Sequence, residues 1–119
     1  MRKTIAVLSL SLISLASFST ASEAATRIKF ARGSYCGSYS GNFSNGREFV
    51  LRLGANQTFT SRNIGGGNQY DVYVVGPRGR VAGDKVSRNQ ITYQTTVSGD
   101  YRIYVESSTS YSSIEFCAY

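Results

Sequence analysis

Apolar and polar residues alternate with a period of two through most of the chain from residue 25 onward. This alternation is typical of strands that turn one face toward a core, and no stretch there has the i, i+3, i+4 spacing of an amphipathic helix. The sequence therefore predicts an all-β fold. The eight predicted strands cover residues 27–30, 35–39, 48–53, 58–60, 71–74, 91–97, 101–105 and 114–117. Short strands with regular turn signals between them indicate a single antiparallel β-sandwich.

Glycine and other turn-forming residues predict the connections between these strands. The turn signal at 98–100 predicts a β-hairpin formed by the two strands that flank it. Loops are expected at 40–46 and at the glycine run 65–67, and a long basic loop is expected after Gly79. The glycine run could also cradle a phosphate, but it lacks the following lysine and the helix N-terminus that bind phosphate elsewhere.

The N-terminus has a different pattern. Two basic residues precede an apolar run over 5–18, and small residues follow up to Ala24. This order is typical of a secretory signal peptide, cleaved after Ala24 or, alternatively, after Ala21. A membrane helix is the competing interpretation, but serines interrupt the run and it is shorter than the roughly 20 apolar residues of a span. We expect residues 25–119 to form one exported domain, secreted or periplasmic, without a membrane span.

The chain has only two cysteines, Cys36 and Cys117, and export would carry them to an oxidising compartment. We expect them to form a disulfide, which by the chain-entropy model destabilises the unfolded chain by roughly 4.5 kcal/mol. Cys117 is opposite in phase to Ile114 and Phe116, so the bridge should lie outside the core and tie the first strand to the last. A metal site or a reactive thiol is the alternative, but the chain has neither histidine nor a CxxC spacing.

Groups suited to catalysis are scarce. Without histidine a conventional catalytic triad is impossible, and no GxSxG motif joins a strand to a helix. The acidic residues occupy outward strand positions or turns, where solvated surface charge explains them, and nothing pairs two carboxylates as a hydrolase would require. The sequence predicts a non-catalytic protein with no catalytic residue, no metal site and no cofactor.

The chain is basic, with 13 Lys and Arg against 7 Asp and Glu, and the predicted cleavage removes two of the former and one of the latter. Guanidinium groups bind carboxylates and phosphates well, so an acidic partner is expected. Arginine can also serve solubility alone, and export argues against nucleic acid as the partner. Most of the basic excess is arginine: Arg47, Arg52, Arg62, Arg78, Arg80, Arg88 and Arg102.

Five surface residues, three of these arginines and two tyrosines, are candidates for binding. Arg78 and Arg80 lie in the predicted loop from Gly76 to Asp84, and Tyr73, Tyr104 and Arg102 lie at outward strand positions. Tyrosine and arginine are typical of the central residues of protein interfaces. Cross-strand packing on a solvated sheet face would explain the two tyrosines equally well.

Four motifs follow one another at 28–33, 49–57, 72–79 and 97–105. Their order and spacing resemble the small bacterial periplasmic inhibitors of goose-type lysozyme and the related pre-peptidase C-terminal-like β-sandwiches, over nearly all of the chain after residue 24. The resemblance implies a sandwich that plugs the acidic catalytic cleft of a lysozyme with loop residues, among them basic ones between the last two strands. Here that loop, 107–110, has no arginine, so no inhibitory residue is carried over.

Three functions remain open from the sequence. The first is a lysozyme-inhibitor-like protein that blocks an acidic cleft, with Arg78 and Arg80 as its contact residues. The second is a non-catalytic module that binds envelope polysaccharide or another exported protein through a tyrosine-rich sheet face. The third is an exported protein whose role no residue reveals.

Overall fold

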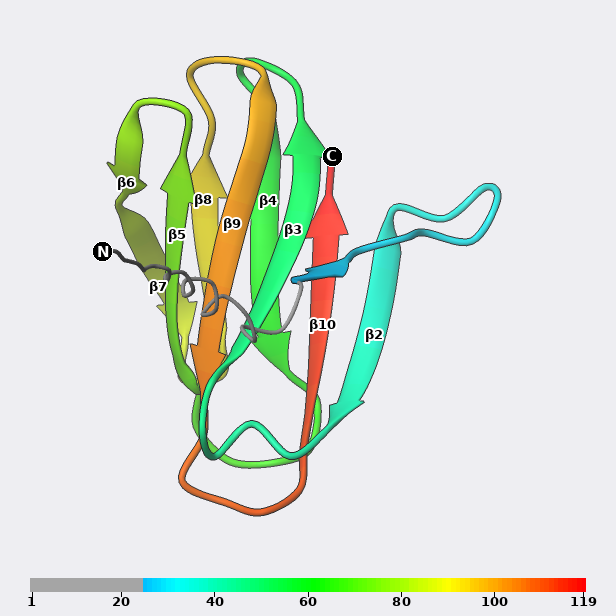
Figure 1. Ribbon diagram of the computed structural model, residues 1–119, viewed down its shortest axis with the longest axis vertical. Coiled ribbons are helices and arrows are strands. Elements are labelled where there is room, and N and C mark those ends of the chain that lie inside the picture. Colours follow the sequence, from blue (N-terminus) through cyan, green and yellow to red (C-terminus); the bar gives the residue numbers. More distant parts are fainter. Residues whose placement is uncertain (1–24) are drawn as a thin grey trace, which may run out of the picture.

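The computed structural model describes residues 25–119, which form ten strands in two layers (Figure 1). Sheet A contains, in spatial order, β1 (Thr26–Arg27), β3 (Arg47–Leu53), β9 (Gly99–Glu106), β5 (Asp71–Gly76) and β6 (Gly79–Val81). Sheet B contains β2 (Cys36–Gly41), β10 (Ser112–Ala118), β4 (Thr58–Asn63), β8 (Gln90–Gln94) and β7 (Gly83–Ser87). The predicted all-β sandwich is confirmed, with ten strands in place of eight.

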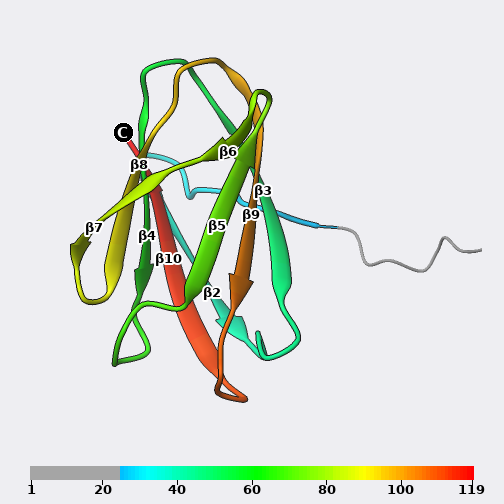
Figure 2. The same cartoon turned by 90° about the vertical axis from the view of Figure 1, so that its left-hand side faces the viewer.

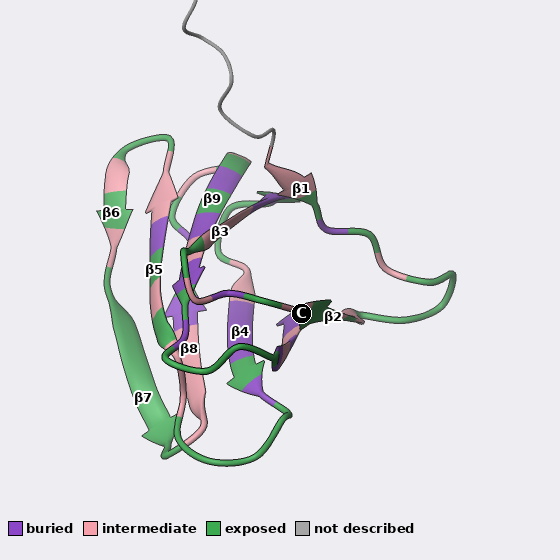
Figure 3. Cartoon of the chain, turned by 60° about the horizontal axis from the view of Figure 1, so that its bottom comes forward, coloured by how far each residue is buried: buried purple, intermediate pink, exposed green. Residues whose placement is uncertain are grey.

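Aromatic side chains fill the space between the sheets. Phe59 and Phe116 of sheet B stack with ring centroids 5.8 Å apart, and Phe49 of sheet A meets Phe116 at 5.0 Å. All three are fully buried, and burying each contributes about 1.5–3 kcal/mol. The period-two pattern produces this core, as the alternating burial along β9 shows (Figure 3), where the inward residues are Tyr101, Ile103 and Val105.

One strand pair departs from the antiparallel prediction, because β1 runs parallel to β3. Ile28 extends the pairing by donating its N–H to the carbonyl oxygen of Val50 at 2.9 Å. Val50 points outward, as predicted, yet it is only 6% exposed. Its register partners Arg27 and Arg102 lie on either side of it on the same face, and the aliphatic stems of arginines cover apolar neighbours.

The predicted hairpin between 91–97 and 101–105 is wrong. β8 pairs with β4 and β7 in sheet B, whereas β9 pairs with β3 and β5 in sheet A. Thr95 holds the connection against the β3–β4 turn: its hydroxyl donates to the carbonyl oxygen of Gly54 at 2.5 Å, and its N–H donates to that of Gln57 at 3.0 Å. A turn signal does not specify whether the next strand returns to the same sheet or crosses to the other one.

The predicted long basic loop after Gly79 is also wrong, since residues 79–87 form two edge strands. β6 pairs with β5 at the edge of sheet A, and β7 pairs with β8 at the edge of sheet B. Figure 2 shows the chain passing directly from one layer to the other between them. Gly83 is needed at this crossing, because a Cβ there would lie 2.5 Å from both Ile91 and Tyr93.

The loops predicted around 40–46 and 65–67 are present, and they are well packed. Phe43, within the turn-prone stretch after β2, is fully buried and lies edge-on to Phe49 at 6.1 Å. Asn63 is buried below the glycine run, and its Nδ2 donates to the carbonyl oxygens of Gly66 at 2.9 Å and Asn68 at 2.6 Å. A buried amide therefore fixes the glycine loop.

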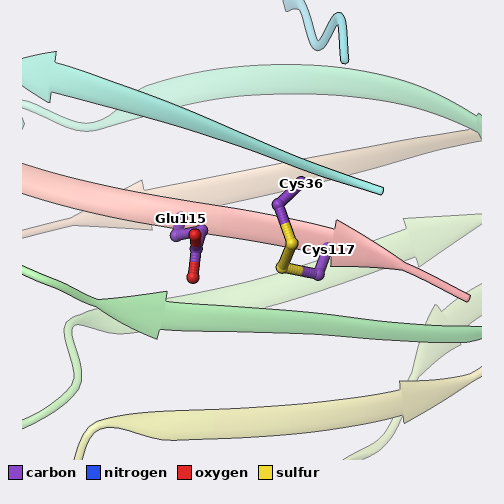
Figure 4. Close-up of side chains that lie close together, drawn as sticks. All are labelled: Cys36, Glu115 and Cys117. Atoms are coloured by element: carbon purple, nitrogen blue, oxygen red, sulfur yellow. A yellow bond between two sulfur atoms is a disulfide. The ribbon is translucent and has the colours of Figure 1, made fainter. Parts of the chain in front are cut away.

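The predicted disulfide is confirmed. Cys36 of β2 and Cys117 of β10 are direct cross-strand partners, joined across 81 residues of sequence. The bridge lies on the outer face of sheet B, on the same side as Glu115 (Figure 4), so its placement outside the core also agrees with the phase of Cys117. It ties the last strand to β2 rather than to the first strand.

The predicted signal peptide, residues 1–24, lies outside the described residues. Among residues 25–119, no helix has the length and apolar character needed to cross a membrane.

Candidate binding face

Strand register brings four of the five predicted binding residues together on the outer face of sheet A. Tyr73 of β5 lies directly opposite Tyr104 of β9. Two residues along β5, Val75 lies opposite Arg102 of β9 on one side and Arg80 of β6 on the other. Cross-strand partners share a face of the sheet. Tyr73, Tyr104, Arg80 and Arg102 therefore form one cluster, which we call the Tyr–Arg patch.

The two tyrosines form the centre of the patch. Their rings are stacked, with centroids 4.9 Å apart and planes inclined by 23°. The guanidinium carbon of Arg80 lies 4.5 Å from the centroid of the Tyr73 ring, within the range of a cation–π contact. Tyr73 remains 42% exposed, so the patch presents a large aromatic surface beside a positive charge.

Arg102 is tied to a carboxylate that the sequence analysis assigned to solvated surface charge. Its Nη1 donates a hydrogen bond to Oε2 of Glu48, which stands opposite Tyr104 on β3. The hydrogen bond and the negative charge of Glu48 raise the pKa of the Arg102 guanidinium above its usual value. Arg102 is therefore always charged but already paired, whereas Arg80 has no ion-pair partner among residues 25–119.

Charge on this face changes sign along the strands. A depression of about 440 Å³ adjoins the tyrosines on the side away from Arg80, and its lining includes the carboxylates of Glu48, Asp71 and Glu106. Partial burial, and secondarily the charge of Glu48, raises the pKa of the Tyr104 phenol, which therefore stays neutral at physiological pH. The face is acidic toward the β9–β10 loop and basic toward the β5–β6 turn.

Arg78, the fifth predicted binding residue, occupies the two-residue turn between β5 and β6. It is exposed, and among residues 25–119 no cation–π contact joins it to either tyrosine. Pro77 precedes it, and Gly79 follows with a φ of 109°, so the turn is tight and places Arg78 at the tip of the hairpin. Arg78 and Arg80 thus form a basic end of the face without a carboxylate partner within the described part of the chain.

The outer face of sheet B has a different character. Its charged pair Arg62–Glu115 is closed, with an N–O distance of 2.7 Å. Most of the other outward side chains are short and uncharged, such as Thr58, to whose hydroxyl Gln94 donates at 2.9 Å. The remaining outward Ser and Thr residues on β2, β4, β8 and β10 are Ser38, Ser40, Thr60, Thr92 and Ser113.

Cys36, Cys117 and Glu115 lie close enough together to suggest metal ligands (Figure 4). Both sulfur atoms are joined to each other in the disulfide, so neither is available as the thiolate that binds zinc. This trio therefore contributes one carboxylate only, and Arg62 already binds it.

Sequence reasoning placed the outward tyrosines correctly but missed Glu48 and the contact of Arg80 with Tyr73. The alternating pattern could have identified Glu48, because it places Glu48 at an outward position of β3. Pairing of β3 with β9 then puts Glu48 on the same face as the tyrosines. For Arg80 no such signal existed, since its position depends on a strand, β6, that the local pattern does not show.

Comparison with known proteins finds similarity in fold alone. No protein-family model and no curated protein matches it. Among solved structures, Salmonella Typhimurium PliG, a periplasmic inhibitor of g-type lysozyme, superimposes with a TM-score of 0.59 at 13% identity, over 82% of this chain and 100% of PliG. Aeromonas hydrophila PliG, also a periplasmic inhibitor of g-type lysozyme, gives 0.56 at 21% identity, over 80% and 96%.

A third solved structure has the same fold. The pre-peptidase C-terminal domain of a Bacillus anthracis collagenase superimposes with a TM-score of 0.56 at 15% identity, over 84% of this chain and 99% of that domain. The sandwich is thus shared by inhibitors and by a domain attached to a protease, so function has to be argued from the surface.

Proposed function

We propose that residues 25–119 form a small, exported, non-catalytic binding protein of the lysozyme-inhibitor type, which binds an acidic surface such as the catalytic cleft of a lysozyme through the basic end of the outer face of sheet A. The observation that carries this proposal is the arrangement of Arg80 over the stacked Tyr73 and Tyr104, without a carboxylate partner among the described residues. Arginine and tyrosine are enriched among the few residues that carry most of the binding energy at protein interfaces.

The fold supports a lysozyme as the partner, because two solved proteins with this sandwich are inhibitors of g-type lysozyme. The pattern of residues 1–24 and the Cys36–Cys117 disulfide support export, since disulfides persist in oxidising compartments. Within the exported compartments we propose a periplasmic location, which the location of those two inhibitors supports.

The contact surface we propose is not the loop between the last two strands, which the family resemblance implied. In this chain that loop, 107–111, lines a hollow together with Asp71 and Glu106. Placing this end in an acidic cleft would bring like charges together, which is unfavourable. Arg78 and Arg80 at the other end of the face provide the complementary sign.

The experiment is inhibition of goose-, chicken- and invertebrate-type lysozymes by the oxidised protein over a range of salt concentrations. We expect inhibition of one type, with an affinity that falls as salt rises because the charged pairs are partly exposed. The double variant Arg78→Ala/Arg80→Ala should bind at least about tenfold more weakly, which corresponds to ~1.4 kcal/mol.

A matched control separates location from net charge. Arg62→Ala/Arg88→Ala removes the same two charges from sheet B and from the β7–β8 turn. It should leave inhibition nearly unchanged, and an equal loss in both double variants would show that net charge, rather than this face, determines binding.

Binding to envelope polysaccharide is tested in parallel by retention on purified peptidoglycan at low salt. The ring of Tyr73 already contacts Tyr104 and Arg80, which leaves less of it free to stack on a sugar and favours a protein partner. Retention on peptidoglycan without inhibition of any lysozyme would replace the proposed function with the polysaccharide-binding one.

A further inference from the structure

A hollow opens at the side of the sandwich, where the chain crosses from β6 to β7. Its volume is about 380 Å³, and it adjoins the Tyr–Arg patch because Tyr73 and Arg80 belong to its lining. The other side chains that matter here are Val72 and Val81 of sheet A and Ile91 and Tyr93 of sheet B. We call this space the side hollow.

The interior of the side hollow is apolar and continuous with the core. Val72, Val81 and Ile91 are partly buried, and all three pack against the buried core cluster. The two sheets are thus incompletely closed along this edge, and the core residues there have an unfilled side. An apolar side chain placed in the hollow would complete the packing and remove apolar surface from water, which is favourable.

Tyr93, which lines the side hollow, has a buried hydroxyl without a hydrogen bond in the part of the chain that the structure describes. Tyr93 is only 3% exposed, and its hydroxyl is the one buried side-chain polar atom among the described residues that makes no hydrogen bond. Buried hydroxyls without a partner are rare in native proteins. Burial raises the pKa of this phenol, an effect partly offset by the neighbouring Ser61 and by the charge of Arg80, so the group remains a neutral hydroxyl inside the sandwich.

The rim of the side hollow carries a positive charge. The guanidinium of Arg80 lies over Tyr73, and no carboxylate pairs with it within residues 25–119. Arginine forms two parallel hydrogen bonds with a carboxylate or a phosphate, and a protein partner offers carboxylates. An apolar space with an arginine at its entrance fits a ligand that has an apolar part next to a carboxylate.

We propose that the side hollow receives one apolar side chain of the partner, presented by a segment in which an aspartate or glutamate stands beside it and pairs with Arg80. This inference rests on the proposed function, because it assumes that the partner surface reaching Arg80 is acidic. It goes further in predicting that the acidic surface has an apolar residue at its border, and that this residue is held between the two sheets.

The hollow can be tested without any lysozyme, using 4-phenylbutyrate as the probe and its uncharged amide as the matched control. We expect 4-phenylbutyrate to shift the backbone amide resonances of β6, β7 and β8 in a saturable manner in ¹H–¹⁵N NMR spectra. The amide, which cannot pair with Arg80, should bind at least about tenfold more weakly, a difference of ~1.4 kcal/mol. Arg80→Ala should reduce binding of the acid to the level of the amide.

Ala82 provides the variant that closes the hollow. It lies on the exposed crossing between β6 and β7 and lines the hollow. Ala82→Trp should abolish binding of the probe, while Ala82→Ser should retain it. Both proteins must keep the native circular dichroism spectrum and the disulfide. Ala55→Trp, in the exposed β3–β4 turn, controls for the added indole and should bind the probe normally.

The outcomes distinguish this inference from the proposed function. Saturable probe binding that Ala82→Trp removes, together with no inhibition of any lysozyme, would keep the hollow and reject lysozyme as the partner. Inhibition that Ala82→Trp leaves intact would keep the proposed function and overturn the hollow as part of the interface. Probe shifts scattered over both sheets, or equal binding of the acid and the amide, would also overturn it.

Discussion

The outer faces of the two sheets differ in how far their charged and aromatic side chains are already paired with one another. On strands β2, β10, β4 and β8 of sheet B the charged pair Arg62–Glu115 is closed, most other outward residues are short and uncharged, and a disulfide joins neighbouring strands. Only the edge strand β7 carries charges without an ion pair among the described residues, Asp84 and Lys85. On sheet A the stacked tyrosines are partly exposed and Arg80 lacks a carboxylate partner among the described residues. Both faces point away from the core, so packing of the core does not require this difference. We interpret sheet B as the face that stabilises the sandwich and sheet A as the face that binds.

The largest effect is expected from removing the disulfide on sheet B. The double variant Cys36→Ser/Cys117→Ser should lower the free energy of unfolding by about 2–5 kcal/mol, because the unfolded chain is no longer constrained across 81 residues. Urea denaturation measures this loss. A change below about 1 kcal/mol would contradict the assignment of sheet B as the stabilising face.

Alkaline pH should destabilise the protein through Tyr93, which lies between the two faces. Burial raises the pKa of its phenol in the folded state, so folding favours the neutral form. The contribution of Tyr93 to the free energy of unfolding should therefore be constant below the unfolded-state pKa of about 10 and fall above it, by up to ~1.4 kcal/mol per pH unit, until the folded-state pKa is reached. Urea denaturation at increasing pH should show a smaller decline for Tyr93→Phe, and an identical decline in both proteins would argue against a buried phenol.

The stacked tyrosines of sheet A should be coupled more strongly than an equivalent pair on sheet B. A double-mutant cycle on Tyr73 and Tyr104, each changed to alanine, should give a coupling energy of about 0.5–1.5 kcal/mol. The matched cycle on Thr60 and Thr92, which are cross-strand partners on sheet B, should give about 0.2–1 kcal/mol. A larger coupling for the threonines would mean that the tyrosines are not packed on each other in solution.

The smallest effects are expected from the ion pairs, and they should be alike on the two faces. Arg102–Glu48 on sheet A and Arg62–Glu115 on sheet B are both partly exposed, so alanine double-mutant cycles should give only a small coupling for each, smaller than that of the stacked tyrosines. Added salt should reduce both values. A much larger value for Arg102–Glu48 would indicate that this pair stabilises the fold, rather than only leaving Arg80 as the unpaired cation of the patch.

Much of the fold could be predicted because the period-two pattern records which side of a strand meets the core. Phe49 and Phe116 were placed inward by phase and are fully buried, and the phase of Cys117 correctly predicted a disulfide outside the core. The pattern also placed Tyr73 and Tyr104 outward. These are local properties, which neighbouring residues are sufficient to determine.

The remaining features depend on pairing between distant strands, which alternation does not encode. The turn before Tyr101 was interpreted as a hairpin because a turn signal is the same whether the chain returns or crosses between sheets. β6 and β7 were missed because Val81 and Val86 are too few apolar residues to give a pattern. The position of Arg80 over Tyr73 depends on β6. The residues of the candidate site could therefore be predicted from the sequence, but their arrangement could not.

The most direct test of the binding face is a titration of the ¹⁵N-labelled protein with the lysozyme that it inhibits best, followed by amide chemical shifts. The account predicts that the largest shifts fall on β5, β6 and β9 around Tyr73, Arg80 and Arg102, with sheet B strands β2, β4 and β10 nearly unaffected. Shifts concentrated on the 107–111 loop or on the outer face of sheet B would contradict it.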